Sequence, residues 1–311
     1  MNTASATNRS FSGRLAASIK SRRSAACIGL DPRREQLPSV LGADTAFDPK
    51  DLAAIYARFC CDVIDVVAPL VPIVKPQLAC FEMLGPHGMT ALAEVIAHAH
   101  AKDLLVLADG KRGDIGSTAE AYADGWLAGP WGTDALTVNP YLGLDSIEPF
   151  VKLASERNAG IFVLVKTSNP GSKDFQELNA DGRTLYQHVA TGVEQFAART
   201  AAGDTYGAVG AVVGATWPRQ LDELRAAMPH TWILVPGFGK QGGRAADVRG
   251  AFHSDGLGAL VVSARDVIFA HARPEMNAGL NESQWQTAVD RACRDMIERI
   301  AADTPAGVLR K

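Results

Sequence analysis

Short apolar runs alternate with longer amphipathic stretches along most of the chain. Eight of these runs, each four to seven residues long, are largely hydrophobic without a polar alternation. That pattern is typical of parallel strands that are covered on both faces. The runs span residues 26–30, 71–75, 104–108, 135–138, 161–165, 207–213, 232–235 and 259–262.

Helical stretches lie between these runs. Residues 51–67 place apolar side chains every three or four positions, which predicts a helix with one buried face. Another helix is predicted to begin near Ser117, because Ser117 and Glu120 fit a capping box. The remaining helices are predicted at residues 90–101, 146–157, 184–199, 218–227 and 281–302.

Eight units of strand and helix close naturally into one (β/α)8 TIM barrel, which we predict for residues 25–305. A doubly wound open sheet is the alternative, but no GxGxxG segment follows the first strand. The 311 residues fit a single barrel. No repeat or linker divides them, and residues 306–311 are expected to form a tail.

The first 24 residues contain five basic residues and no acidic one, a composition typical of a transit peptide. However, Phe11, Leu15 and Ile19 recur every four residues and form one apolar helical stripe. We therefore expect residues 1–24 to provide an N-terminal helix that closes the barrel floor, with targeting as the alternative.

Composition narrows the possible partners. The net charge of −3 argues against a dedicated nucleic-acid binder. No apolar run approaches the roughly 20 residues that a membrane span needs. A small molecule is the expected partner.

The five cysteines show no CxxC spacing, and Cys27 and Cys80 lie in apolar stretches. Cys27 and Cys80 are expected to be buried as free thiols. Free thiols indicate a reducing compartment, so we expect the protein in the cytoplasm.

The chemistry of (β/α)8 barrels lies where strands end and loops begin. Polar residues, glycines and one proline stand at the ends of six of the predicted strands: Asp31; Lys75; Asp109, Lys111 and Asp114; Lys166 and Ser168; and, at the last two strands, Pro236, Gly237, Gly239, Gln241 and Arg265. Because all these strand ends meet at one rim, we predict the active site there.

Asp109 and Lys111 are two residues apart, so both side chains can face the barrel mouth while the backbone is extended. Lys75, from the neighbouring strand, can approach the same point. An alternating Lys/Asp/Lys array would keep each group charged. The alternative is an ordinary salt-bridge network at the rim, which would contribute little stability.

A phosphate site is predicted above the last two strands, a common location in these barrels. Gly237 and Gly239 let backbone N–H groups approach an anion closely, and Arg265 can bind it through two hydrogen bonds. Taken alone, the glycines could form only a turn and Arg265 could be only a surface cation.

Residues 109–118, Asp-Gly-Lys-Arg-Gly-Asp-Ile-Gly-Ser-Thr, resemble the D-x-K-x-x-D-I signature of orotidine 5′-monophosphate decarboxylases, most closely their longer bacterial branch. Four more segments are similar to that family, and the match runs in order from about Phe11 to about residue 270. They read Gly-Leu-Asp-Pro at 29–32, Val-Lys-Pro-Gln at 74–77, Lys-Thr-Ser-Asn-Pro at 166–170, and Pro-Gly-Phe-Gly with Gln-Gly-Gly at 236–243.

The resemblance implies a role for each matching residue. Lys111 would donate a proton to C6 of the pyrimidine as carbon dioxide leaves, and Asp109 would lie against the substrate carboxylate. Lys75 and Asp31 would hold the ribose hydroxyls. Ser168 would contact the pyrimidine, under a lid formed by residues 169–183. Gln241 would grip the phosphate with Pro236, Gly237, Gly239 and Arg265.

The resemblance also implies a homodimer with shared active sites, in which Asp114, Ile115 and Thr118 are lent to the other subunit. No step needs an electron sink, so no metal or organic cofactor is expected.

Two rival functions remain. A metal-dependent sugar-phosphate lyase or synthase can share D-x-K-x-x-D, but it uses an acidic residue where this chain has Lys75. A non-catalytic nucleotide sensor would need the phosphate grip but not the charged array.

Overall fold

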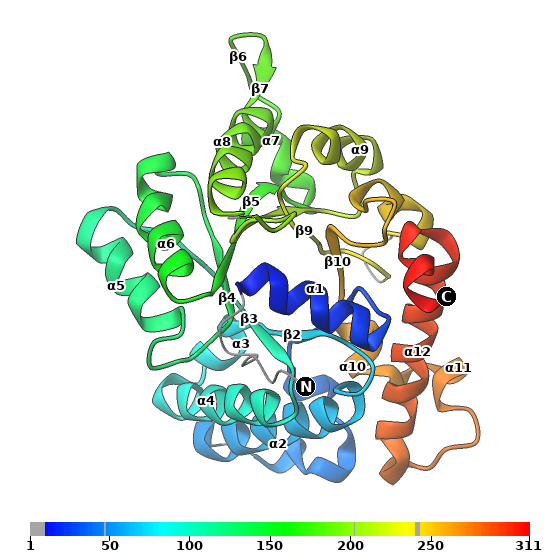
Figure 1. Cartoon of the computed structure of the whole chain (residues 1–311). Coiled ribbons are helices and arrows are strands. Elements are labelled where there is room, and N and C mark those ends of the chain that lie inside the picture. The colour runs from blue at the N-terminus through cyan, green and yellow to red at the C-terminus, as the bar shows by residue number, and fades with distance from the viewer. Residues whose placement is uncertain (1–9, 47, 202, 240–242) are drawn as a thin grey trace, which may run out of the picture.

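The structure is a computed structural model that describes residues 10–46, 48–201, 203–239 and 243–311. In this part of the chain, eight parallel strands close into a barrel in the order β1-β10-β9-β8-β5-β4-β3-β2 (Figure 1). The strands are β1 (Ala26–Leu30), β2 (Ile73–Pro76), β3 (Leu105–Arg112), β4 (Ala135–Val138), β5 (Gly160–Lys166), β8 (Val209–Val213), β9 (Ile233–Val235) and β10 (Ala259–Ser263). The predicted barrel is confirmed, and the open sheet is wrong.

Helices surround the barrel and shield the outer faces of its strands (Figure 1). The longer ones are α2 (Pro49–Val67), α4 (Gly85–Ala101), α5 (Gly116–Trp126), α6 (Leu144–Glu156), α8 (Leu185–Thr200), α9 (Pro218–Ala227) and α12 (Trp285–Asp303). Between β9 and β10 the covering element is a 3-10 helix, η6 (Ala245–Ala251), which explains the weak periodicity of that segment. The 3-10 helix η9 (Pro305–Arg310) packs on α12, so most of the expected tail is folded.

Helix α1 (Phe11–Arg22) closes the floor of the barrel, as predicted. Figure 1 views the molecule from this end, with α1 lying across the ring of strands. Phe11, Leu15 and Ile19 are buried in one cluster with the residues that fill the lower barrel. The ring of Phe11 meets that of Phe162 edge-on at 6.2 Å. An ion pair of 2.5 Å between Arg14 and Asp134 fixes the polar side of the helix.

Helix α5 begins within one residue of the predicted start, but its capping differs from the prediction. The helix begins at Gly116, and its N-cap residue Ile115 makes no side-chain capping bond. The capping box of Ser117 and Glu120 is therefore wrong. Gly116 has a φ of 50°, so a glycine turn starts the helix and places Ser117 inside its first turn. Helix α4 likewise begins earlier than predicted, at Gly85, with a proline in its first turn as is common at helix starts.

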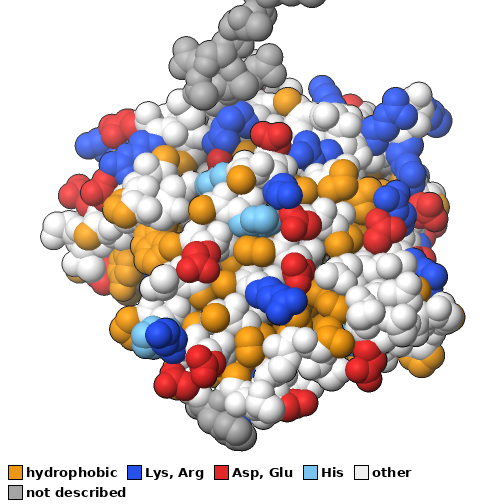
Figure 2. Space-filling model, turned by 90° about the horizontal axis from the view of Figure 1, so that it is seen from below, with side chains coloured by type: hydrophobic (Ala, Val, Ile, Leu, Met, Phe, Trp, Pro, Cys, Tyr) orange, Lys and Arg blue, Asp and Glu red, His pale blue; other side chains and the backbone are white. Residues whose placement is uncertain are grey.

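Figure 2 shows the face that lies at the bottom of Figure 1, where α2 and α4 cover the barrel. Acidic and basic side chains are interspersed there rather than gathered by sign. Asp65 on α2, for example, contacts both His98, at 2.9 Å, and Lys102, at 2.7 Å. No helix in the described ranges is long and apolar enough to cross a membrane.

Candidate active site

A cavity of about 820 Å³ opens at the carboxyl ends of the strands, opposite α1. Eight of the residues predicted for the site line it: Asp31, Lys75, Asp109, Lys111, Ser168, Pro236, Gly237 and Arg265. They come from six different strand ends, so the closure of the barrel brings together residues that are far apart in the sequence.

Asp109 is the centre of the polar network in this cavity. Its Oδ2 atom accepts hydrogen bonds from Lys75 Nζ at 2.6 Å and from Gln77 Nε2 at 3.1 Å. Its Oδ1 atom accepts hydrogen bonds from Lys111 Nζ at 2.6 Å and from Thr137 Oγ1 at 3.0 Å. The predicted Lys/Asp/Lys array is therefore present, and all four neighbours of the Asp109 carboxylate donate hydrogen bonds to it.

The backbone of β3 reaches this arrangement by a different route from the one predicted. Its register against β4 shifts between Ala108 and Arg112, so the strand is not regular through the signature. Lys111 has a φ of 47°, the left-handed region that lysine rarely adopts. Its backbone N–H donates to Thr137 Oγ1 at 2.8 Å, which holds this conformation. Backbone strain of this kind gathers at functional sites.

Electrostatics keep the inner part of the array charged. Burial alone would raise the pKa of Asp109, but the charges of Lys75 and Lys111 outweigh burial and hold this pKa well below its usual range. Burial alone would lower the pKa of Lys75, but Asp109 and then Asp31 raise it above its ordinary value. Lys75 and Asp109 are thus an ion pair over the whole physiological range. Lys111 differs in exposure, because 47% of its side chain is accessible.

Asp31 lies at the end of β1 with an unused acceptor. Its Oδ1 atom is buried and accepts no hydrogen bond from the described residues. A buried carboxylate oxygen without a donor is costly, so a ligand hydroxyl would be favoured beside it.

Only some of the residues predicted to bind the phosphate line the cavity. Pro236, Gly237 and Arg265 line it. Gly239 does not line it, and its N–H, which was predicted to approach the phosphate, donates to Gly243 O at 3.0 Å. A side chain at Gly239 would meet Asp266 Oδ2 at 2.1 Å, so glycine is needed there for close packing. Gln241 lies outside the described residues.

Asp114, Ile115 and Thr118 do not line the cavity of their own barrel. Asp114 and Ile115 lie in the turn before α5 and Thr118 lies in its first turn; Asp114 Oδ1 accepts a hydrogen bond from Ile115 N at 2.8 Å. Ile115 and Thr118 are exposed, and Ile115 has 59% of its surface accessible.

Sequence reasoning missed two donors to Asp109. Gln77 is two residues after Lys75, so the same alternation that linked Asp109 and Lys111 could have identified it. Thr137 lies in an apolar strand and carried no such signal. The cavity wall contributed by Asn139 and Tyr141 was missed as well.

The fold and this cavity define a (β/α)8-barrel enzyme with a carboxylate held between two ammonium groups. Residues 25–278 match the model of the orotidine 5'-phosphate decarboxylase / HUMPS family. The chain belongs to this family, which confirms the resemblance found in the sequence.

Individual relatives agree with the family match. The chain is 55% identical to orotidine 5'-phosphate decarboxylase of Rhodopirellula baltica over 93% of this chain and 98% of the relative. It is 47% identical to the enzyme of the same name from Deinococcus radiodurans over 80% of this chain and 86% of the relative. Among solved structures, a putative orotidine-monophosphate-decarboxylase from Toxoplasma gondii superposes with a TM-score of 0.80 at 32% identity, covering 96% of this chain and 98% of that one.

Proposed function

We propose that this protein decarboxylates orotidine 5′-monophosphate to uridine 5′-monophosphate (UMP) and carbon dioxide, a step of pyrimidine biosynthesis. The observation that carries the proposal is Asp109, a buried carboxylate that receives hydrogen bonds from both Lys75 and Lys111 in the cavity. The name shared by the most similar relatives supports the same activity.

Binding would place the charged ends of the substrate at opposite sides of the cavity. The phosphate would lie near Gly237 and Arg265, where a guanidinium and backbone N–H groups suit an anion. The ribose hydroxyls would donate to the unused oxygen of Asp31 and contact Lys75. Ser168 would face the pyrimidine. The carboxylate at C6 would then point at Asp109 and Lys111.

The chemical step needs an environment that favours loss of a neutral molecule from an anion. Repulsion between Asp109 and the substrate carboxylate raises the energy of the bound ground state, and binding of the distant phosphate offsets that cost. When the C6–carboxylate bond breaks, its electron pair stays on C6. The ammonium of Lys111 stabilises this charge and transfers one proton to C6, which leaves UMP and carbon dioxide. We expect no cofactor to take part.

The two lysines would have different tasks. The side chain of Lys75 is 7% accessible and is fixed between Asp109 and the end of β1, so it suits binding and orientation. Lys111 is the more accessible ammonium, and after turnover it can regain its proton from solvent.

Substrate choice tests the proposal against the metal-dependent rival. A divalent cation would be repelled by the ammonium of Lys75, 2.6 Å from Asp109. We expect EDTA-treated protein to turn over orotidine 5′-monophosphate, monitored by the change in ultraviolet absorbance. Activity only on a pentulose or hexulose phosphate with added magnesium would overturn the proposal. Binding of nucleotide without turnover of either substrate would indicate a sensor.

We further propose that the protein is a homodimer with shared active sites. Asp114, Ile115 and Thr118 do not line their own cavity, and Ile115 and Thr118 are exposed, as residues lent to a partner subunit would be. Ile115 is apolar and 59% accessible, as a side chain that only a partner subunit covers would be.

Mixing two inactive variants tests the shared site. Asp114→Ala and Lys111→Ala subunits are each expected to be inactive alone. After they are unfolded and refolded together, half of the dimers would combine one of each, and one of the two sites in such a dimer would be intact. Activity should therefore return to about one quarter of the wild-type value per subunit. No recovery, with dimers present in sedimentation analysis, would contradict shared sites.

A cytoplasmic location is also proposed. None of the five cysteines, all of which the structure describes, forms a disulfide, and only Cys61 is more than marginally accessible. Free thiols fit a reducing compartment. Fractionation of cells that express a tagged protein tests this, and recovery in an oxidising compartment would contradict it.

A further inference from the structure

A buried lysine lies beside the cavity without lining it. Lys166, the last residue of β5, is 0% exposed. Its Nζ atom donates to Glu177 Oε1 at 2.8 Å and to Ser172 Oγ at 3.1 Å. It also lies 4.4 Å from the ring centre of Trp217. The decarboxylation described above does not use this ammonium.

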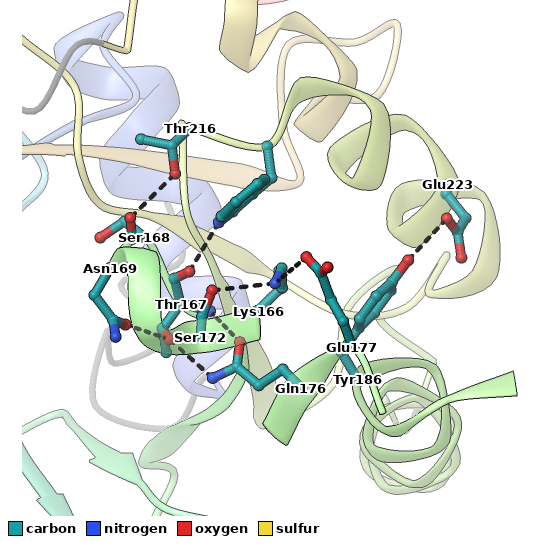
Figure 3. Close-up of polar contacts among 11 residues, drawn as sticks. Lys166, Thr167, Ser168, Asn169, Ser172, Gln176, Glu177, Tyr186, Thr216 and Glu223 are labelled. Carbon is teal, nitrogen blue, oxygen red and sulfur yellow. Dashed lines mark hydrogen bonds and ion pairs between the residues drawn. The ribbon is translucent and has the colours of Figure 1, made fainter. Parts of the chain in front are cut away.

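Both hydrogen-bond acceptors of Lys166 lie on the loop that follows it (Figure 3). This loop contains a 3-10 turn, η5 (Pro170–Ser172), and the short helix α7 (Lys173–Gln176). Glu177 is the only carboxylate at ion-pair distance from Lys166 among the described residues. Burial of an unpaired ammonium strongly destabilises a folded protein. The loop therefore supplies the counter-charge that makes burial of Lys166 possible, but only while it lies against the barrel.

The same loop forms one wall of the cavity. Thr167, Ser168, Asn169, Phe175 and Gln176 all line it. Gln176 closes the loop on itself, since it accepts from Thr167 N at 2.9 Å and donates to Thr167 Oγ1 at 2.8 Å. Figure 3 shows these bonds next to those of Lys166. A change at Lys166 would thus be transmitted to the cavity wall.

Ser168 is sensitive to any such movement. A Cβ at Gly214, just after β8, would lie 2.8 Å from Ser168 Cα, so the two backbones are in direct contact. Trp217 Nε1 donates to Thr167 O at 2.8 Å on the same side. The serine is therefore held between the end of β8 and the loop that Lys166 anchors.

We propose that Lys166 is a positioning residue whose ion pair with Glu177 holds the loop after β5 against the barrel and places Ser168 for contact with the pyrimidine. This rests on the proposed function for the identity of the ligand, but the coupling between Lys166 and the loop does not. The lysine touches neither the substrate nor the reacting atoms.

The test compares two ligands that differ only in the base. In Lys166→Met, whose side chain is apolar and of similar length, the Kd of UMP from calorimetry should rise about tenfold or more, the effect of a misplaced contact residue. The Kd of ribose 5-phosphate, which lacks the pyrimidine, should not change. The control is Lys152→Met, which removes an exposed lysine on α6, away from this loop, and should leave both affinities unchanged.

A second readout needs no nucleotide. Trypsin can cut the loop region at Lys173 and Arg183, and this cleavage should be faster in Lys166→Met than in wild type. Glu177→Gln, which changes a partly exposed residue, should show the same two effects more weakly. It provides the decisive variant if Lys166→Met does not fold.

The outcomes separate the two proposals. Unchanged UMP affinity and unchanged cleavage in a folded Lys166→Met, or in Glu177→Gln, would overturn the positioning role. Equal losses for UMP and ribose 5-phosphate would do the same, because they would point to general disruption. A wild-type protein that binds UMP but does not decarboxylate would refute the proposed function alone, and the cleavage experiment would still test the loop.

Discussion

Replacement of Lys111 by alanine is expected to lower kcat by about 10⁴-fold or more, because one side chain supplies both charge stabilisation and the proton. The variant should lose kcat but keep its affinity for UMP. UMP has no carboxylate at C6, so Lys111 makes no ion pair with it that the variant could lose. The measurement is steady-state turnover of orotidine 5′-monophosphate together with the Kd of UMP.

Two further variants separate the contributions of Lys111. Lys111→Gly accepts the φ of 47° without strain and should be as inactive as alanine, which excludes a backbone effect. Lys111→Arg keeps the positive charge but is too weak an acid to give up its proton, so it should also remain nearly inactive. Activity within tenfold of wild type in any of the three would mean that the proton reaches C6 from another group.

Asp109→Asn is expected to destabilise the protein by about 3 kcal/mol at pH 7, because it leaves the buried ammonium of Lys75 without its closest counter-charge. Asp31, which also raises the pKa of Lys75, offsets only part of the loss. Activity should be lost at the same time, since the asparagine side chain no longer repels the substrate carboxylate. Urea denaturation monitored by circular dichroism measures the first effect.

The pH dependence of this difference follows from the direction of the shift. The pKa of Asp109 is lower in the folded protein than in the unfolded chain, so its stabilising effect is complete above the unfolded value and is lost as the pH falls through the folded one. The gap between wild type and Asp109→Asn should therefore be constant near neutrality and narrow below about pH 4. A gap that does not depend on pH would show that the charge of Asp109 is not what stabilises the site.

A paired replacement provides the control for stability. Lys75→Met combined with Asp109→Leu removes both charges and leaves apolar groups of similar size, so most of the lost stability should return while activity stays absent. A double variant less stable than Asp109→Asn would indicate that packing, rather than an unpaired charge, explains the single variant.

Much of this site could be predicted because parallel strands bring their carboxyl ends to one rim. Lys75 and Asp109 lie near the carboxyl ends of neighbouring strands, β2 and β3, so strand order alone predicts their contact. The link between Asp109 and Lys111 was also predicted, although an irregular β3 and a left-handed residue achieve it in place of an extended strand. The geometry differed because the sequence pattern carries no information on such a local distortion.

Other contacts could not be predicted, because they depend on tertiary packing. The N–H of Gly239 is engaged by Gly243, which no glycine pattern reveals. Thr137 belongs to an apolar strand, and only the position of β4 beside β3 in the barrel brings its hydroxyl within hydrogen-bond distance of Asp109. The pairing of Lys166 with Glu177 depends on how the intervening loop folds back onto β5. Loop conformations are more variable than helices and strands, so the sequence pattern does not predict this contact.

We propose that this protein removes carbon dioxide from C6 and replaces it with a proton. Proton NMR of the product formed by EDTA-treated protein in deuterium oxide tests it most directly, since the exchangeable protons of Lys111 become deuterons in that solvent. We expect UMP that carries deuterium at C6 and therefore lacks the H6 signal. Orotidine 5′-monophosphate recovered unchanged, or UMP that retains hydrogen at C6, would contradict it.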